Sequence, residues 1–460
     1  MEAITIPHVR IPSINIGGIC LPGIGASGSI GKKGLIWPAG MKEHIKAWYD
    51  PKKQGITNFD VIEAYTEDFT TWTVNKEGVI ANVTSKSITI TNVLNSNPLI
   101  YAYDTFSVRL RIDGLKNGQG IFFGDNKEYT ISENGIYDID TTENIRTNFI
   151  GECDITITQL PTSILKDFSG NGNHAYLYGG KGKLNSGMGL YKVDFTSWRF
   201  YPSFNTIEYY HNKLVIKKAP DSKNLCAHTF TDKFTAKISN IPDGTNLYYR
   251  YYDRINKKNV SILLHNGINE IDYTNADGSI DATNMFIISK DVDFNITIEQ
   301  IPDYPDQLCY DGKMYAVCYG FPILTDYTVM AERTWFESNP YCAFISNRDD
   351  DITENRRGAF VFEQLNGGVQ GTSSFGSIPS INFVSEKISW QTKESYNGKS
   401  IGFGSNISSN PVIVVGAGVY YTNTNKVASY ANLCHGTIII ADRSFTEEEI
   451  NWLKQNWDKI

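Results

Sequence analysis

The sequence predicts an all-β protein. Of its 460 residues 13% are aromatic, including 27 Tyr and 23 Phe, and β-branched residues are abundant, a composition typical of strands. Asn-Gly and Asp-Gly pairs recur between short apolar stretches, as in the tight turns that join antiparallel strands. The chain also repeats part of itself, which indicates that some of these strands belong to a duplicated domain.

Three short segments occur twice in the same order. They are Asp68–Trp72 and Asp194–Trp198, Asn134–Ile136 and Asn266–Ile268, and Asp154–Pro161 and Asn295–Pro302. The offsets are 126, 132 and 141 residues, so the order is kept while the loops lengthen. This period is too long for a solenoid repeat and matches a small domain. Short alternating strands between turn signals favour a small β-sandwich, so we predict two homologous modules, at 67–163 and 193–302.

Residues 1–41 form a separate N-terminal segment in which Ile, Pro and Gly alternate without helical or strand periodicity. It is too apolar for an ordinary solvated linker, so we expect an extended arm that lies on another surface. A partner protein is the preferred surface, and the chain's own domain is the alternative. The apolar residues expected to attach the arm to a particle are Ile11, Ile14, Ile16, Leu21, Ile24 and Trp37.

The remaining residues, 42–66, 164–192 and 303–460, show no repetition. The only convincing helix closes the chain, where Thr446 and Glu449 have the spacing of a capping box. Ile450, Leu453 and Trp457 then fall on one helical face.

Four segments of this remainder resemble, in order, the concanavalin A-like, laminin-G-like jelly-roll superfamily. Ala47–Pro51 matches its first strand, and Leu165–Ala175 contains its Asp-x-Ser-Gly-Asn-Gly-Asn-His turn. Asp326–Ala331 matches a strand in the middle of the domain, and Asp442–Ile450 matches the closing strand and the acidic residues after it.

The resemblance covers roughly half the chain and implies a lectin-like jelly-roll sandwich that is interrupted by the two modules. Whole-domain insertions are tolerated where the ends of exposed loops lie close together. The arrangement is also similar to virion proteins of phages that infect gut Bacteroidales, in which lectin-like domains decorate heads and tail fibres.

Charge and hydropathy exclude several partners. The net charge is −8 without long runs of either sign, whereas a nucleic-acid surface needs clustered Lys and Arg. No apolar run reaches the ~18 residues of a membrane helix, and no secretory signal is visible. We therefore expect neither nucleic acid nor membrane as a partner. If the protein acts outside a cell, it leaves by lysis or inside a particle.

The seven cysteines are odd in number and form no Cys-x-x-Cys pair. A zinc site needs ligands in closer pairs than these. Buried free thiols in a chain that folds in a reducing cytoplasm are the preferred interpretation.

Sugar binding needs an exposed aromatic side chain with amides nearby. Trp335, Tyr420 and Tyr421 are the candidate aromatics, although a place in the core is the default interpretation for each and sugar contact the alternative. Asn171 and Asn173 are the candidate amides, for which the default interpretation is that they only satisfy the backbone of a tight turn. A glycan or calcium contact is the alternative.

Asp349 and Asp351 belong to an acidic cluster for which a solvated loop is the default interpretation and calcium the alternative. No other cofactor is expected. A glycosidase needs two carboxylates across a cleft, whereas Glu363 and Glu386 stand isolated in the sequence. We therefore predict that the chain is not an enzyme.

The preferred hypothesis is a phage virion protein, made in the host cytoplasm, that forms a head-fibre, tail-fibre or decoration subunit. Its arm would bind capsid or tail proteins, and its domains would project, in one version to touch host glycans. A homotrimer would place three arms on one symmetric socket. A bacterial surface lectin is the alternative, and a polysaccharide depolymerase is a third hypothesis.

Overall fold

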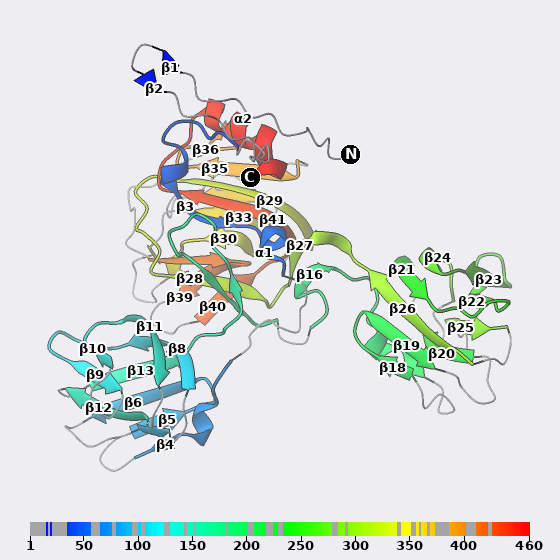
Figure 1. Cartoon of the computed structure of the whole chain (residues 1–460), viewed down its shortest axis with the longest axis horizontal. Coiled ribbons are helices and arrows are strands. Elements are labelled where there is room, and N and C mark those ends of the chain that lie inside the picture. The colour runs from blue at the N-terminus through cyan, green and yellow to red at the C-terminus, as the bar shows by residue number, and fades with distance from the viewer. Residues whose placement is uncertain are drawn as a thin grey trace. The chain divides into compact units, whose positions relative to one another are not determined.

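Figure 1 shows a computed structural model of the chain. Besides two short strands near the N-terminus, it describes residues 35–56, 65–75, 80–93, 100–102, 106–123, 129–141, 145–150, 153–180, 183–200, 207–217, 224–228, 233–277, 284–289, 293–337, 342–350, 356–357, 360–365, 369–372, 386–401, 411–421 and 426–460. Two compact units are present, one of Met1–His44 with Phe445–Ile460 and the other of Ile45–Ser444. Strands predominate in the described residues, which confirms the all-β prediction.

The first unit contains the C-terminal helix, α2 (Glu447–Asn456), which is followed by η5 (Trp457–Lys459). Its capping box forms as predicted, because the Thr446 hydroxyl accepts from the backbone N–H of Glu449 at 3.3 Å. The Glu449 carboxylate in turn accepts from the backbone N–H of Thr446 at 2.9 Å. These two bonds satisfy amides that the first turn of a helix leaves without partners.

The N-terminal part of this unit meets the helix through an aromatic contact. Trp37 lies against Trp452 with ring centroids 5.0 Å apart, while the neighbouring Ile36 is 80% exposed. The unit also contains η1 (Lys42–His44) and a short antiparallel pair, β1 (Asn15–Ile16) with β2 (Ile19–Cys20). This pair is a small departure from the strand-free arm that the sequence suggested.

The second unit is built on a two-sheet sandwich. One sheet has the order β16-β27-β41-β29-β35-β36-β37, with β3 also paired to β41. Its strands are β3 (Ile45–Tyr49), β16 (Gly187–Leu190), β27 (Asp303–Asp311), β29 (Thr328–Glu337), β35 (Ile388–Thr392), β36 (Ser395–Tyr396), β37 (Lys399–Ser400) and β41 (Asn432–Ala441). The short helix α1 (Pro51–Gln54) follows β3 directly.

The other sheet has the order β14-β15-β28-β38-β30-β33-β34. Its strands are β14 (Ile164–Leu165), β15 (Ala175–Tyr178), β28 (Tyr315–Tyr319), β38 (Val412–Val415), β30 (Ala343–Ser346), β33 (Val361–Leu365) and β34 (Val369–Thr372). The hairpin β39 (Ala417–Tyr421) and β40 (Lys426–Tyr430) and the pair β31 (Asp349–Asp350) and β32 (Arg356–Arg357) stand outside both sheets. Three distant segments of the chain thus share one core, with Tyr49, Leu177 and Ile440 in the same buried cluster.

Two smaller sandwiches are inserted into this scaffold, module 1 (67–163) and module 2 (193–302). The strands of module 1 are β4 (Thr73–Val74), β5 (Ile80–Val83), β6 (Ser87–Val93), β7 (Ile100–Ala102), β8 (Phe106–Asp113), β9 (Gly120–Phe123), β10 (Tyr129–Ile131), β11 (Gly135–Thr141), β12 (Ile145–Ile150) and β13 (Cys153–Gln159). Those of module 2 are β17 (Arg199–Phe200), β18 (Ile207–Tyr209), β19 (Lys213–Lys217), β20 (Asn224–His228), β21 (Lys233–Ser239), β22 (Leu247–Asp253), β23 (Lys258–Leu264), β24 (Gly267–Asp272), β25 (Asn284–Ile288) and β26 (Asn295–Ile301).

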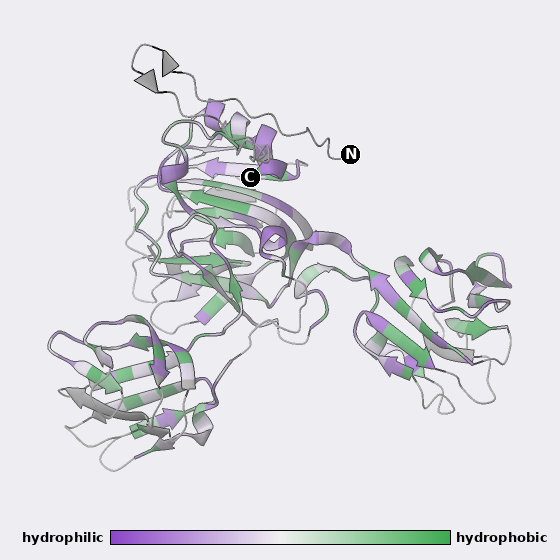
Figure 2. Ribbon diagram, in the orientation of Figure 1, coloured by the Kyte–Doolittle hydropathy of each residue, from purple (hydrophilic) through white to green (hydrophobic). Residues whose placement is uncertain are grey.

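The two modules have one topology. The sheet β10-β9-β12-β7-β4 of module 1 corresponds strand for strand to β23-β22-β25-β20-β17 of module 2. The sheet β11-β8-β13-β6-β5 corresponds in the same way to β24-β21-β26-β19-β18. Each module buries a hydrophobic cluster of its own, and Figure 2 shows hydrophobic residues gathered along these strands. The modules are therefore duplicated domains with separate cores.

Several residues of the repeated segments have side chains that form hydrogen bonds to the backbone. Asp68 caps η3 (Phe69–Thr71) and Asp194 caps η4 (Phe195–Ser197), each accepting from the N–H two residues on at 2.9 Å. Such caps satisfy amides that a helical turn leaves open.

The Asn of the second repeated segment works in a similar way. The Asn134 side chain accepts from and donates to the backbone of Leu115, and Asn266 does the same with Ile241. The repeat therefore preserves turn-forming hydrogen bonds.

In each module a buried glutamine near the end of the module binds the backbone of the segment that enters the module from the scaffold. Gln159 Oε1 accepts from the backbone N–H of Thr66 and of Glu67, both at 3.0 Å, and its amide donates to Glu67 O at 2.9 Å. Gln300 makes the equivalent three bonds to residues 192–193, at 2.7 to 3.0 Å. We call this arrangement the neck clasp, because it joins the incoming and outgoing segments of each module.

Candidate functional site

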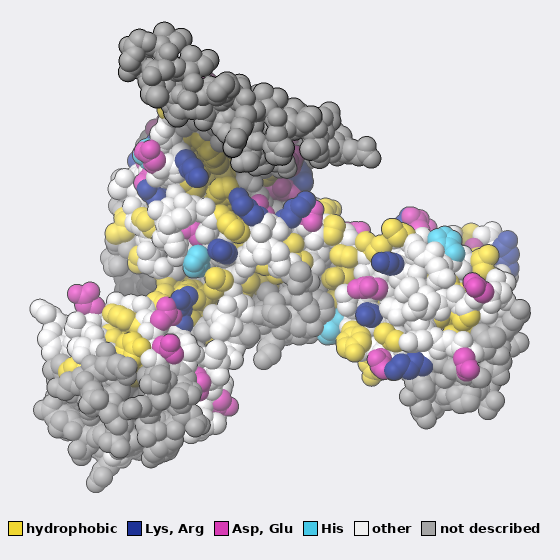
Figure 3. All heavy atoms as spheres, viewed as in Figure 1, with side chains coloured by type: hydrophobic (Ala, Val, Ile, Leu, Met, Phe, Trp, Pro, Cys, Tyr) yellow, Lys and Arg dark blue, Asp and Glu magenta, His cyan; other side chains and the backbone are white. Residues whose placement is uncertain are grey.

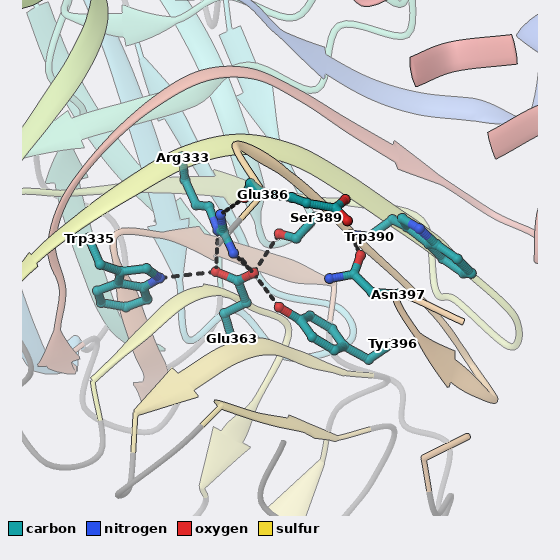
Figure 4. Close-up of polar contacts among 8 residues, drawn as sticks. All are labelled: Arg333, Trp335, Glu363, Glu386, Ser389, Trp390, Tyr396 and Asn397. Atoms are coloured by element: carbon teal, nitrogen blue, oxygen red, sulfur yellow. Dashed lines mark hydrogen bonds and ion pairs between the residues drawn. The ribbon is translucent and has the colours of Figure 1, made fainter. Parts of the chain in front are cut away.

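The described part of the sandwich contains a buried carboxylate that gathers five donor groups, and Figure 4 shows this cluster. Glu363 is 0% exposed and lies on β33, in one sheet. Its partners come from β29, β35 and β36, in the other sheet. The carboxylate thus links the two sheets across the core.

An arginine neutralises the carboxylate in a fork geometry. Arg333 Nε lies 2.8 Å from Glu363 Oε2, and Arg333 Nη2 lies 2.8 Å from Oε1. The remaining guanidinium nitrogen, Nη1, donates to the backbone carbonyl of Glu386 at 2.6 Å. A bidentate Arg–carboxylate pair combines charge with fixed orientation, which makes it stronger than a single hydrogen bond.

Three neutral donors complete the cluster. Ser389 Oγ and Tyr396 Oη donate to Glu363 Oε1 at 2.5 and 2.7 Å. The indole N–H of Trp335 donates to Glu363 Oε2 at 3.0 Å. Glu363 itself has a φ of +55°, which costs energy for any residue but Gly. The hydrogen bonds and the ion pair hold the strained residue in place.

The electrostatics of Glu363 are set by opposing effects. Burial by itself raises the pKa of its carboxyl, but Arg333, Ser389 and Trp335 together lower that pKa below its usual value. The same carboxylate helps to raise the pKa of the Tyr396 hydroxyl, after the larger effect of burial. Glu363 is therefore a charged, sealed group whose oxygens are all engaged within the fold, and the geometry suits a structural link between sheets.

Glu363 and Glu386 stand isolated in the sequence, and no sequence pattern linked Arg333, Ser389 or Tyr396 to them. The structure corrects this for Glu363, which sits at the centre of a network. A partial signal was present in the sequence, because the charged pair Glu332-Arg333 interrupts the apolar strand that begins at Val329, and strand alternation places Arg333 on the same face as Val329 and Ala331. An inward charge in such a strand requires an opposite charge nearby.

The predicted amides serve the turn that follows Leu165. Asn171 Nδ2 donates to the carbonyl of Ile45 at 2.8 Å, and Asn173 Nδ2 donates to the carbonyl of Lys46 at 2.7 Å. Asp167, 5% exposed, accepts from the backbone N–H of Trp48 and of Asn173. These bonds fasten the turn to β3, so the amide hydrogens of both asparagines are committed to the scaffold.

The predicted aromatics lie in different surroundings. Trp335 belongs to the Glu363 cluster. Tyr420 is 2% exposed and its hydroxyl accepts from Arg111 Nη1 at 2.5 Å, so its role as an exposed sugar contact is corrected. Burial among Val317, Val412 and other residues covers its ring. Tyr421, the next residue on β39, is partly exposed.

The metal and arm predictions fall largely outside the described residues. Asp351 lies outside them, and of Asp349 only the backbone is described, in β31. Ile11, Ile14, Leu21 and Ile24 also lie outside, while Ile16 contributes its backbone to β1. Among the described residues, no group of three or more His, Cys, Asp and Glu side chains could hold a metal ion. Within those same residues, no helix has the length and hydropathy to cross a membrane.

Histidine 435 has partners that the sequence did not reveal. It is 0% exposed, its Nδ1 bonds the carbonyl of Gly436 at 2.7 Å, and its Nε2 lies 3.2 Å from the Tyr310 hydroxyl. Burial lowers the pKa of His435 to about 4, so the ring is neutral at pH 7.

Cys309 and Cys434, near His435, face each other across β27 and β41 as buried free thiols. Cys318 and Cys342 are also buried and free. The thiol prediction is confirmed for these four cysteines.

Lowering the pH from 7 to 5 is expected to destabilise the jelly roll through His435. Unfolded His435 titrates near 6.5 whereas the folded side chain titrates near 4, so the unfolded state binds the extra proton. The free energy of unfolding should fall by up to about 1.4 kcal/mol per pH unit below 6.5. Urea unfolding at pH 7.5, 6 and 5 measures this slope. His435→Gln, which does not titrate, should flatten it, and an unchanged slope would contradict the assignment.

Comparisons with known proteins leave the family of the chain open. No protein-family model and no curated protein matches it. Two solved structures of Trypanosoma rangeli sialidase, one with the inhibitor DANA and one with 2,3-difluorosialic acid, are 10% identical and cover 86% of this chain and 94% of theirs. Their TM-scores are 0.23 and 0.24. A structure titled for the triple jelly-roll fold and turret assembly of an archaeal virus is 10% identical, covers 89% and 99%, and has a TM-score of 0.11. Such low scores carry no argument about function.

Proposed function

We propose that this protein is a structural protein of a phage particle, a head-fibre, tail-fibre or decoration subunit that displays β-domains. The observation that carries the proposal is the architecture of the second unit. A jelly-roll scaffold carries two copies of one module, and each copy has its own core and is closed by a neck clasp. This architecture suits a chain that presents modules, and the principal buried charges, Arg333 and Glu363, serve to hold its scaffold together.

The absence of catalysis belongs to the same proposal. Glu363 is sealed in the core, where it links two sheets and does not face a substrate. We further propose a homotrimer, because a symmetric assembly would present three arms to one socket. Capsid or tail proteins are the partners proposed for residues 1–41. For the acidic segment that includes Asp349, a solvated loop remains the default interpretation and calcium the alternative. On the face in Figure 3, basic and acidic side chains are interspersed, which supports a partner other than nucleic acid.

Adhesion to a host-surface glycan is the second part of the proposal, and a bacterial surface lectin remains the alternative. Both use the scaffold or its modules to bind sugar. They differ in where the protein resides, because only the first requires the protein inside purified particles. Mass spectrometry of particles from the encoding phage, with copy number, separates the two. Stoichiometric copies in a multiple of three support the virion proposal, and absence from the particles contradicts it.

Deleting residues 1–34 is expected to leave the protein folded but to abolish its incorporation into particles. This boundary spares Trp37, which contacts Trp452 on α2, and Met41, which is 0% exposed. The deletion therefore removes most of the proposed arm without disturbing the described contacts of the helix. Particles assembled with the truncated chain are purified and its copies counted by mass spectrometry. Wild-type copy number in those particles would refute attachment through the arm.

A further inference from the structure

One sheet of module 2 presents a row of large polar and aromatic side chains on its outer face. Along β22 the residues alternate, so that Leu247, Tyr249 and Tyr251 point into the module and are buried. Tyr248, Arg250 and Tyr252 occupy the opposite face, as the two-residue period of a strand requires. Arg250 is exposed and the two tyrosines are partly exposed.

The neighbouring strand extends this row into a platform. Leu263 of β23 stands opposite Tyr248, Ser261 opposite Arg250, and Asn259 opposite Tyr252. Leu263 is 59% exposed. Side chains paired across two antiparallel strands lie about 5 Å apart, and four residues of strand span about 13 Å. We call these six residues the Tyr248–Leu263 platform.

Hydrogen bonds fasten the turn at the end of the hairpin that carries the platform. Asp253 accepts from the backbone N–H of Ile255 and of Asn256, which closes the turn between β22 and β23. The backbone N–H of Asp277 donates to the carbonyl of Tyr252, and that of Arg254 donates to the carbonyl of Asn275. A preorganised surface loses less entropy when it binds a ligand.

The charge of the hairpin points to the kind of ligand. Residues 247–264 contain Arg250, Arg254, Lys257 and Lys258 but only one acidic residue, Asp253. Asp253 is 4% exposed and is occupied by the turn. This basic segment belongs to a chain of net charge −8. Arg250 is exposed on this face, and a guanidinium there suits pairing with an anion.

We propose that the Tyr248–Leu263 platform binds an acidic polysaccharide. Tyr248 and Tyr252 offer rigid, amphipathic rings to the faces of the sugars. Arg250, between them, pairs with a sugar carboxylate in the fork geometry that guanidinium and carboxylate share. Asn259 and Ser261 supply hydrogen bonds to hydroxyl groups. The inference rests on the proposed function in that it gives the projecting modules an adhesive role.

Module 1 provides an internal comparison. Its equivalent hairpin is shorter in sequence, with 11 residues from Ile121 to its partner Ile131 against 18 from Leu247 to its partner Leu264. By strand register, Phe122 and Thr130 take the places of Tyr248 and Leu263. The long, basic, tyrosine-bearing hairpin thus belongs to module 2, which is where binding is expected.

The test measures binding of the full-length protein to three acidic polymers, polygalacturonate, alginate and chondroitin sulfate. Dextran serves as the neutral polymer and single-stranded poly(dT) as the competing polyanion. The wild type should bind at least one acidic polymer and prefer it to dextran and poly(dT). Arg250→Gln should weaken this binding about tenfold or more, because it removes a charged hydrogen bond. Tyr252→Ser should weaken it about threefold or more.

Two matched variants control for charge and ring area. Arg199→Gln removes an exposed cation from β17 of the same module, and Tyr210→Ser removes a ring that is 55% exposed. Both should bind like the wild type. Equal losses in the controls, no binding to any acidic polymer, or a preference for dextran or poly(dT) would each overturn the proposal.

Two further measurements separate this inference from other outcomes. Light scattering of Arg250→Gln should show the wild-type oligomer, since dissociation would mean that the platform contacts a second copy of the chain and would overturn the proposal. The copy number of the protein in particles tests the proposed function alone. Stoichiometric incorporation without polysaccharide binding would overturn this inference only, whereas absence from particles would overturn the virion proposal whatever the binding.

Discussion

Replacing Arg333 with Met is expected to lower the free energy of unfolding of the jelly roll by about 3–5 kcal/mol. The variant leaves the Glu363 carboxylate 0% exposed and without its counter-charge. Ser389, Tyr396 and Trp335 still donate to it, but three neutral donors do not replace a bidentate cation. Urea unfolding of the wild type and the variant at pH 7 gives the difference.

The pH dependence of that difference identifies Glu363 as its cause. In the wild type the folded pKa of Glu363 lies below the usual value of 4.5, so its contribution is present above pH 4.5 and is lost as the pH falls further. Without Arg333, burial is the largest remaining influence and raises this pKa. The free energy of unfolding that Arg333→Met loses should therefore be largest at neutral pH. The difference in free energy of unfolding between wild type and variant should become smaller from pH 7 to pH 5.

Two controls make the prediction decisive. Adding Glu363→Met to Arg333→Met removes the buried charge altogether and should recover most of the lost stability, since apolar pairs replace buried ion pairs well. Hydrogen exchange should show the loss in the jelly-roll strands and not in the modules, whose hydrophobic clusters are separate. A loss below about 1 kcal/mol, or a gap that widens toward pH 5, would contradict the assignment.

The parts of this fold that were predictable from sequence are those whose signal is local. The C-terminal helix is predictable from Thr446 and Glu449, which are three residues apart and whose side chains each accept a hydrogen bond from the backbone N–H of the other. The repeat was visible because Asp68 and Gln159 recur as Asp194 and Gln300. Each of these side chains binds a definite backbone segment, so both copies have kept the residue while their loops changed length.

The buried cluster was not predictable because its members are distant in sequence and belong to different sheets. Glu363 lies 30 residues from Arg333 and 33 from Tyr396 along the chain. The contact of Glu363 with Arg333 and Tyr396 depends on the register of β29 and β36 and on the positive φ of Glu363. The buried Tyr420 failed as a sugar contact for a related reason, since composition does not reveal which face of a strand is covered.

Replacing Gln300 with Leu is expected to destabilise module 2 by about 2–4 kcal/mol. The change leaves the N–H groups of Lys192 and Val193 and the carbonyl of Val193 without the partner that binds them now. Each buried backbone group that loses its bond costs about 1–3 kcal/mol, partly offset where water reaches the neck. Hydrogen exchange followed by mass spectrometry reports the stability of module 2 separately from that of the scaffold.

Gln159→Leu is the matched variant, because it opens the equivalent neck clasp on module 1. If each clasp serves only its own module, each variant should accelerate exchange in one module and leave the other at the wild-type rate. Gln300→Glu keeps an acceptor for the two N–H groups but loses the donor to Val193 O. At pH 5, where the new carboxyl is closer to neutral, the loss of stability of module 2 should lie between that of wild type and that of Gln300→Leu. A larger loss at pH 7 than at pH 5 would measure the cost of burying the new charge. Unchanged exchange in both leucine variants would mean that hydrophobic packing closes the modules and that the repeated glutamines contribute little to their stability.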